Sequence, residues 1–238
     1  MSESLPLTYA DLAAILLFLA VWIVHTLAVE GFLVSRVSLS SAMNAQREAW
    51  MRMMARRELR MIDTGIMTGL QQGTAFFAST SLFAIGGCFA ILRSSGEVIA
   101  VLTDLPVVAE TSRGAFEIKL LGLICLLAYS FFKFGWSYRL FNYCSILIGA
   151  VPSAQDATVA PQQIEAAVRR ATRMNVLAGR HFNAGQRGFF FSIAYLGWFV
   201  GPAVLVLATI LLFAVLLNRQ FFSAARRAAL DGVHSADA

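Results

Sequence analysis

Six polar side chains lie within or beside the apolar segments of this sequence, and they are its first candidates for chemistry. At about 1.5 Å of rise per helical residue, all six fall in the cytoplasmic half of a bilayer. They are His25, Glu30, Asp63, Gln71, Lys133 and Arg139. Ionisable groups in lipid are costly and are therefore functional candidates. One interpretation is a polar vestibule or a proton or ion path. The alternative is salt bridges, such as Glu30 with Lys133 or Arg139, that fix helix ends.

The sequence carries no motif that would name a reaction. G-x-S-x-G, H-E-x-x-H and P-loop patterns are all missing. Cys88, Cys125 and Cys144 lie in apolar segments without C-x-x-C spacing, which indicates buried, unreactive thiols. His25 has no second histidine or cysteine at a metal-ligand spacing. We therefore predict no catalytic residue, no metal site, no cofactor and no enzymatic activity.

A basic stripe is the second candidate feature. Arg52, Arg56 and Arg60 follow Glu48 at intervals of four residues, so they share one face of a helix. Trp50 and several methionines lie elsewhere on the same helix. One interpretation is an amphipathic helix packed on a cap, with its basic face solvated or bound to lipid phosphates. The other is a surface that gathers anionic lipid, a charged ligand or a protein partner.

Three glycines form the third candidate feature. Gly65, Gly69 and Gly73 repeat every four residues at the start of an apolar segment. Small residues at this spacing let helices approach closely in lipid. They could pack helices within one chain or join the subunits of an oligomer, and the spacing leaves both possibilities open.

The composition is typical of a membrane protein. Of 238 residues, 58% are hydrophobic and 14% charged, whereas a soluble domain carries roughly a quarter charged residues. The net charge of +5 comes from arginines clustered in loops, a pattern that orients a membrane protein and is not that of a nucleic-acid groove. We predict an all-α integral membrane four-helix bundle. Its predicted spans are residues 12–29, 67–92, 115–136 and 188–217.

The distribution of arginine also predicts an orientation. By the positive-inside rule, residues 40–66, 137–151 and 155–187 form a cytoplasmic helical cap into which the long helices extend. The loop at 94–113 carries the acids Glu97, Asp104 and Glu110, which fits the external side. Four spans then place both termini outside the inner membrane of a bacterium, although the late arginines at 219, 226 and 227 oppose this for the C-terminus.

Two further predictions concern helix continuity. No proline separates Asn44 from Arg93, so we predict one unbroken helix that enters the bilayer between Asp63 and Met67. Gly201-Pro202 lies inside the fourth predicted span, where it predicts a local kink.

Four segments carry a resemblance to a known family. They are NAQREAWMRMM (44–54), FFASTSLFAIGG (76–87), YSFFKFGWSYRLFN (129–142) and RHFNAGQRGFFFSIAYLGWFVGP (180–202). Together they resemble the DUF599 membrane proteins of bacteria and plants over nearly the whole chain. Lys133 departs from the family pattern. The resemblance implies a membrane location and this fold, and it supplies no catalytic residues.

We therefore predict a non-enzymatic, multi-pass protein of the inner membrane. The first interpretation is an oligomeric channel- or transporter-like protein for ions or small solutes. The alternative is a scaffold or accessory subunit of a larger membrane complex, docked through the arginine-rich cap. The partners expected are the lipid bilayer, anionic lipids and further copies of the chain or other membrane subunits, with no nucleic acid.

Overall fold

The computed structural model describes residues 7–103 and 112–231, and within those ranges the chain is helical with no strand. The helices are α1 (Tyr9–Val29), α2 (Leu39–Ala55), α3 (Met61–Arg93), α4 (Ser95–Thr103), α5 (Arg113–Gly149), α6 (Pro161–Tyr195), α7 (Gly197–Val200), α8 (Pro202–Phe221) and α9 (Ala224–Leu230). The acids Asp104 and Glu110, assigned above to an external loop, lie outside the described residues.

Several helix starts follow from local sequence. Thr8 and Asp11 form a capping box at α1, in which each side chain bonds to the other residue's backbone N–H. Pro161 and Pro202 occupy the first turns of α6 and α8. Proline is well suited there because its missing N–H would have had no helical partner.

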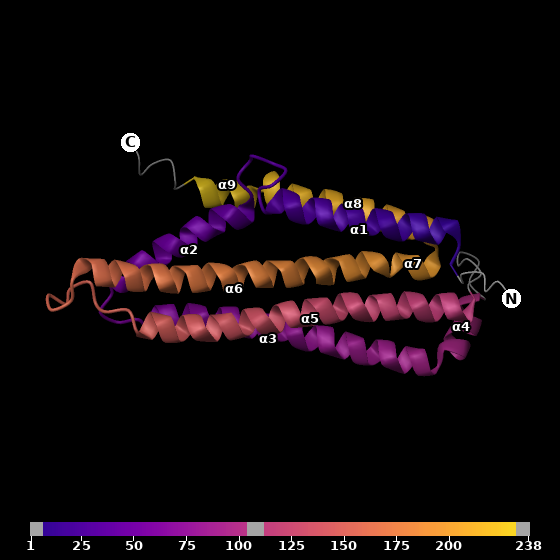
Figure 1. Cartoon of the computed structure of the whole chain (residues 1–238), viewed down its shortest axis with the longest axis horizontal. Coiled ribbons are helices and arrows are strands. Elements are labelled where there is room, and N and C mark those ends of the chain that lie inside the picture. Colours follow the sequence, from indigo (N-terminus) through magenta and orange to yellow (C-terminus); the bar gives the residue numbers. More distant parts are fainter. Residues whose placement is uncertain (1–6, 104–111, 232–238) are drawn as a thin grey trace.

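Three long helices form the centre of the molecule and run its whole length (Figure 1). They are α3, α5 and α6, with 33, 37 and 35 residues. Each is therefore about 50 Å long or more, well beyond the ~30 Å of a hydrocarbon core. Their neighbours change along this length, so the molecule has two halves.

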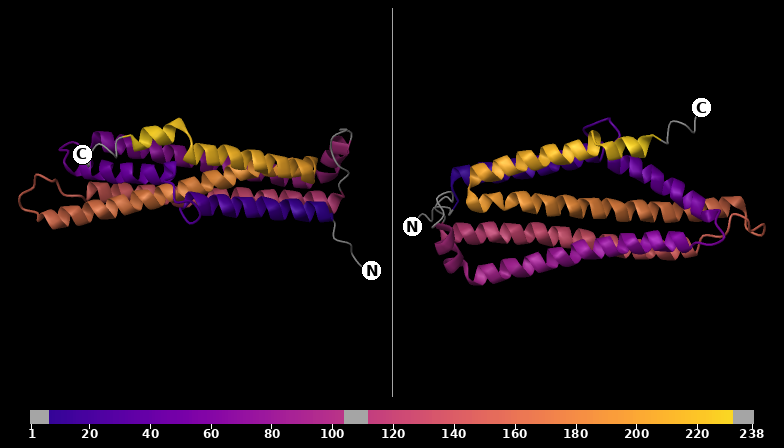
Figure 2. Two further views of the ribbon diagram at one scale, coloured as in Figure 1. Left: turned by 90° about the horizontal axis from the view of Figure 1, so that it is seen from above. Right: turned by 180° about the vertical axis from the view of Figure 1, so that it is seen from behind.

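We call these the α1 half and the α2 half. In the α1 half, α1 and α8 lie side by side and cover α6 (Figures 1 and 2). In the α2 half, α2 packs on α6 and α9 packs on α2. Four segments are long and apolar enough to cross a membrane: α1, α3, α5 and residues 202–230, which hold α8 and α9. These findings fit a membrane bundle, and α1, with 21 residues, is itself about as long as one crossing.

Each half has its own core. The core of the α1 half combines leucine side chains with aromatic rings, among them Phe18 of α1, Phe191 and Tyr195 of α6, and Trp198 of α7. The core of the α2 half is built mostly from methionine, alanine and aliphatic side chains. It comprises Met51, Met54, Ala55, Met67, Leu140, Phe141, Cys144, Ile148, Val151, Ala167, Val168, Ala171 and Ala178.

The prediction of one unbroken helix from Asn44 to Arg93 is wrong. α2 ends at Ala55, α3 begins at Met61, and the chain reverses direction between them. The turn is held by partners distant in sequence. Arg60 donates to the carbonyl oxygens of Ile148 and Val151 at 2.8 and 2.7 Å, where α5 ends. These bonds add partners to carbonyls at the end of α5, where no further helical turn follows.

The single span predicted at 188–217 is also wrong, because Gly201-Pro202 is a reversal and not a kink. α6 continues to Tyr195, and α8 then runs back antiparallel to it (Figure 1). Gly201 has an extended backbone, and Pro202 starts a new helix. The end of α6 and α8 therefore lie beside each other in the α1 half.

This reversal changes where the chain ends lie. Tyr9 is at the far end of the α1 half, whereas Leu230 lies in the α2 half (Figure 1). The two ends of the described chain therefore lie at different levels of the bundle.

Candidate functional site

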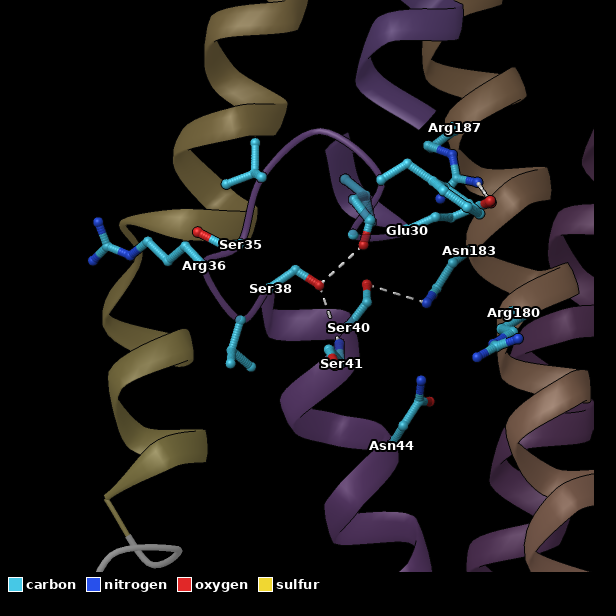
Figure 3. Close-up of a pocket in the computed structure, with 15 residues that line it drawn as sticks. Glu30, Ser35, Arg36, Ser38, Ser40, Ser41, Asn44, Arg180, Asn183 and Arg187 are labelled. Atoms are coloured by element: carbon cyan, nitrogen blue, oxygen red, sulfur yellow. Dashed lines mark hydrogen bonds and ion pairs between the residues drawn. The ribbon is translucent and has the colours of Figure 1, made fainter. Parts of the chain in front are cut away.

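A pocket opens where the two halves meet, and we call it the junction pocket (Figure 3). Its volume is about 540 Å³. Three elements contribute: the end of α1 with the connection to α2, the first turns of α2, and the middle of α6. The polar residues that line it are Glu30, Ser35, Arg36, Ser38, Ser40, Ser41, Asn44, Arg180, Asn183 and Arg187.

One side of the junction pocket is fixed by an ion pair. The guanidinium of Arg187 lies 3.5 Å from the carboxylate of Glu30, the residue that ends α1. The Arg187 side chain is 12% exposed and that of Glu30 51% exposed. Glu30 therefore offsets the charge of a nearly buried arginine, which would be costly without a partner.

The start of α2 is also held in place, and its first amides are already bonded. The Ser38 hydroxyl accepts from Ser41 N–H at 3.2 Å and donates to the Val29 carbonyl. Ser40 N–H donates to the side chain of Gln220 in α8, and the Asn183 amide donates to the Ser40 hydroxyl at 3.4 Å. An incoming anion would therefore depend on side chains for its hydrogen bonds.

Several polar side chains in the pocket lack hydrogen-bond partners among the described residues, and two of them face each other. Arg180 of α6 and Asn44 of α2 make no side-chain hydrogen bond or ion pair within the described ranges, and Figure 3 shows them on either side of open space. Arg36 instead lies over the ring of Phe222 at 4.8 Å. With Arg36 included, the charged groups that line the pocket are three arginines and one glutamate, which carry two net positive charges. The arrangement suits a small anionic group.

Arg47 fixes α2 against α6 just beyond the pocket. It donates to the backbone and side-chain oxygens of Asn175 at 3.2 and 3.3 Å. A Cβ on Gly179 would lie 2.0 Å from the Arg47 guanidinium, so glycine makes room for it. Burial lowers the pKa of Arg47 from its ordinary value, since a desolvated guanidinium is less stable in its charged form.

The structure does not bring the six vestibule candidates together. Only Glu30 reaches the junction pocket, and its partner is Arg187; the predicted pairing with Lys133 or Arg139 is wrong. His25 is buried between the rings of Phe191 and Phe213, and neither of its nitrogens has a hydrogen-bond partner in the described structure.

The other four candidates make separate contacts. Asp63 accepts from Trp50 at 2.7 Å and pairs with Arg57 at 2.5 Å. Gln71 donates to Asn142 and Ser145 of α5. Lys133 lies over the Tyr129 ring, and Arg139 donates to the Tyr143 hydroxyl. These contacts join neighbouring helical turns or packed helices and outline no common cavity.

The basic stripe is divided by the turn between α2 and α3. Arg52 stays on α2, with Glu48 at 2.8 Å and Glu165 at 3.9 Å. Arg56 ends that helix and is exposed. Arg60 caps α5 as described, so it is not free for lipid. The three arginines do not form one continuous surface.

The glycine triplet lies open along α3. A Cβ on Gly65, Gly69 or Gly73 would meet no atom within 4 Å outside its immediate helix backbone. The interpretation that these glycines pack helices within the chain is therefore wrong. Packing between subunits remains a prediction.

A second polar cluster, at the far end of the α1 half, was not among the predicted sites. Lys119 of α5 lies 3.2 Å from Asp11 of α1 and donates to the Trp198 carbonyl. Trp198 in turn donates to Asp11 at 2.6 Å. The sequence did contain a signal for this cluster, namely an aspartate and a lysine near the corresponding ends of two apolar helices.

The junction pocket also had a signal in the sequence. Arg180, Asn183 and Arg187 are spaced at three and seven residues, which places them on one helical face. They belong to the segment 180–202, and Asn44 opens the segment 44–54, both of which carry the family resemblance.

Comparison with known proteins identifies the family and no activity. The family model described as "Protein of unknown function, DUF599" matches residues 13–225. No curated protein and no solved structure matches the chain. The match covers most of the sequence, from α1 into α9, and confirms the resemblance. The chain therefore belongs to the DUF599 family.

Proposed function

We propose that this protein is an oligomeric, transporter-like protein of the bacterial inner membrane whose junction pocket binds a small anionic group. The observation that carries the proposal is the unpaired Arg180 beside the Arg187–Glu30 pair, at the level where α1 ends. Arg180 is available, and Arg187 is partly neutralised by Glu30. This arrangement is suited to reversible anion binding, because an anion that binds Arg180 displaces no permanent counter-ion.

The orientation that fits this role has the N-terminus outside and the C-terminus inside. If the end of α6 crosses together with the four candidate spans, the arginine-rich α2 half lies on one side with α9, which carries Arg226 and Arg227. All the basic segments then share the cytoplasmic side, as the positive-inside rule favours. The late arginines no longer conflict with the rule, as they did when both termini were placed outside.

A path for the solute would run between subunits or open by a rearrangement. Aromatic rings fill the α1-half core of a single chain, including the stacked pair Trp22 and Phe191. The exposed glycines of α3 support a second copy, since helices approach closely at such positions. We place the subunit contact there.

Flux through proteoliposomes tests the proposal. We expect uptake of small anions, with acetate and inorganic phosphate as the first probes. Arg187→Gln should reduce it at least tenfold, because the buried arginine helps to bind the anion and opposes Glu30. Arg173→Gln, on the same helix and outside the junction pocket, is the matched control. Equal uptake by both variants, or no uptake by the wild type, would count against transport.

The subunit contact has its own variant. Gly69→Leu adds a side chain that meets nothing within the chain, so the monomer should fold normally. We expect a smaller particle by light scattering in detergent. Gly135→Leu, at an equally open glycine of α5, is the control.

A scaffold role is the second candidate. It is favoured by a broad depression of about 850 Å³ at the tip of the α2 half, which includes Arg52, Arg56, Asp156 and Glu165. Mixed charges of this kind suit a polar protein contact. Stable co-purification of a membrane partner that is lost in Arg56→Glu, without any flux, would favour this role over transport.

A further inference from the structure

We propose that the anionic group bound in the junction pocket is the phosphate of an anionic phospholipid from the adjacent leaflet. This inference deepens the proposed function only in that it takes the junction pocket to be a ligand site. It does not depend on flux.

The depth of the pocket places it among lipid headgroups. α1 is 21 residues long, or about 31 Å, which matches the thickness of a hydrocarbon core. If α1 spans that core, Glu30 and the start of α2 lie at the boundary with water. The phosphates of one leaflet occupy the same depth. The pocket therefore faces lipid phosphate without any movement of the helices.

The donors in the pocket suit a phosphate. Arg180 is uncommitted, and a planar guanidinium can donate two parallel hydrogen bonds to phosphate oxygens. The unpartnered amide of Asn44 lies across the open space from it (Figure 3). Arg187 adds positive charge that Glu30 only partly offsets, since that carboxylate is half exposed. Arg180 is thus the main ligand, and the first amides of α2 are already bonded.

The rim of the pocket distinguishes a lipid from a free anion. The connection after α1 exposes Phe32, Leu33 and Val37 by 75, 57 and 45%. Phe222, at the end of α8, is exposed by 59% and lies beneath the Arg36 guanidinium. Apolar side chains gathered beside a basic pocket gain nothing from a phosphate ion in water. They are stabilised by contact with acyl chains attached to that phosphate.

Lipid binding to the full-length protein tests the inference. The protein, purified in detergent, is titrated with phosphatidylglycerol or phosphatidylcholine, and bound lipid is counted by native mass spectrometry. We expect a preference for phosphatidylglycerol in the wild type. Arg180→Gln should weaken phosphatidylglycerol binding roughly tenfold, the loss of one charge-assisted contact. Arg180→Lys keeps the charge but lacks the paired donors of a guanidinium. Its affinity for phosphatidylglycerol should therefore lie between those of the wild type and Arg180→Gln.

The Arg180→Gln variant should fold normally, because Arg180 has no bonded partner to lose within the described ranges. Arg173→Gln again removes one arginine from α6 outside the pocket, and it should bind lipid as the wild type does. Equal phosphatidylglycerol affinity in Arg180→Gln and Arg173→Gln would overturn the inference. So would displacement of the lipid by inorganic phosphate at comparable concentration, which would identify a free anion as the ligand.

The lipid and transport proposals can fail separately. Arg180-dependent lipid binding without flux would leave this inference standing and remove the transport role. The opposite result is Arg187-dependent flux in vesicles of phosphatidylcholine alone, from a protein that shows no lipid preference. It would support the transport role and remove the lipid inference.

Discussion

The two halves of this molecule use the same three helices, α3, α5 and α6, but they are built on different chemistry. In the α1 half, polar groups are few and one cluster of Asp11, Lys119 and Trp198 closes the far end. In the α2 half, polar bonds join helices at many points, among them Arg47 to Asn175 and Arg60 to the end of α5. The comparison shows two differently built halves along a single helix bundle.

The difference extends to how charge is buried. Both side chains of the Asp11–Lys119 pair are less than a tenth exposed. In the Arg57–Asp63 pair, the aspartate is fully buried but the arginine side chain is 36% exposed. An arginine at the surface can turn to water if its partner is lost, whereas Lys119 cannot. Breaking equivalent contacts should therefore have unequal consequences in the two halves.

The largest effect is expected for Asp11→Leu in the α1 half. Removing the carboxylate leaves Lys119 buried without a counter-charge, which costs about 3 to 5 kcal/mol of unfolding free energy. Trp198 loses the acceptor for its indole N–H in the same step. Thermal unfolding in detergent would measure the loss.

A double variant provides the control for that experiment. Asp11→Leu combined with Lys119→Met removes both charges and should recover much of the stability, because an apolar pair can replace a buried ion pair. A single Asp11→Leu variant as stable as the wild type would show that Lys119 reaches water, and the contrast between the halves would be lost.

An intermediate effect is expected in the α2 half at Gly179. A Cβ there would collide with the Arg47 guanidinium, so Gly179→Ala should displace Arg47 and cost roughly 1 kcal/mol. The cost is modest because the end of a flexible side chain can move. Gly135→Ala, where nothing lies within 4 Å, should instead gain up to about 1 kcal/mol from helix propensity. Opposite shifts in melting temperature would confirm that Arg47 requires the glycine.

The features that sequence predicts well are those determined within one element. The apolar run of α1 is such a local signal, and the apolar, charge-poor composition predicts helices of the membrane type. The turn after Ala55 is not local. It depends on Arg60 meeting carbonyls at the end of α5, nearly ninety residues away. No helix-breaking residue marks it, so an uninterrupted helix was the natural expectation.

The candidate site shows the same limit. Glu30 was recognised as a boundary carboxylate, but its partner could not be chosen among the arginines without knowing that α6 passes α1. The Gly201-Pro202 pair is compatible with both a kink and a reversal, and that choice decides the number of passes. Arg180 and Asn44 line the same pocket only because α2 returns to α6 at the level where α1 ends.

The smallest effect is expected at the surface of the α2 half, and it tests whether that surface lies in water. Arg52 and Glu48 form an exposed pair one helical turn apart, with both side chains more than half exposed. In water, Arg52→Ala should cost about 0.3 to 0.5 kcal/mol, and salt should screen most of this difference. Thermal melting at low and high ionic strength would measure it. A much larger loss that salt does not change would mean that the pair is shielded from water by lipid or a second subunit. The α2 half would then share the solvent of the α1 half, contrary to the division drawn from their cores.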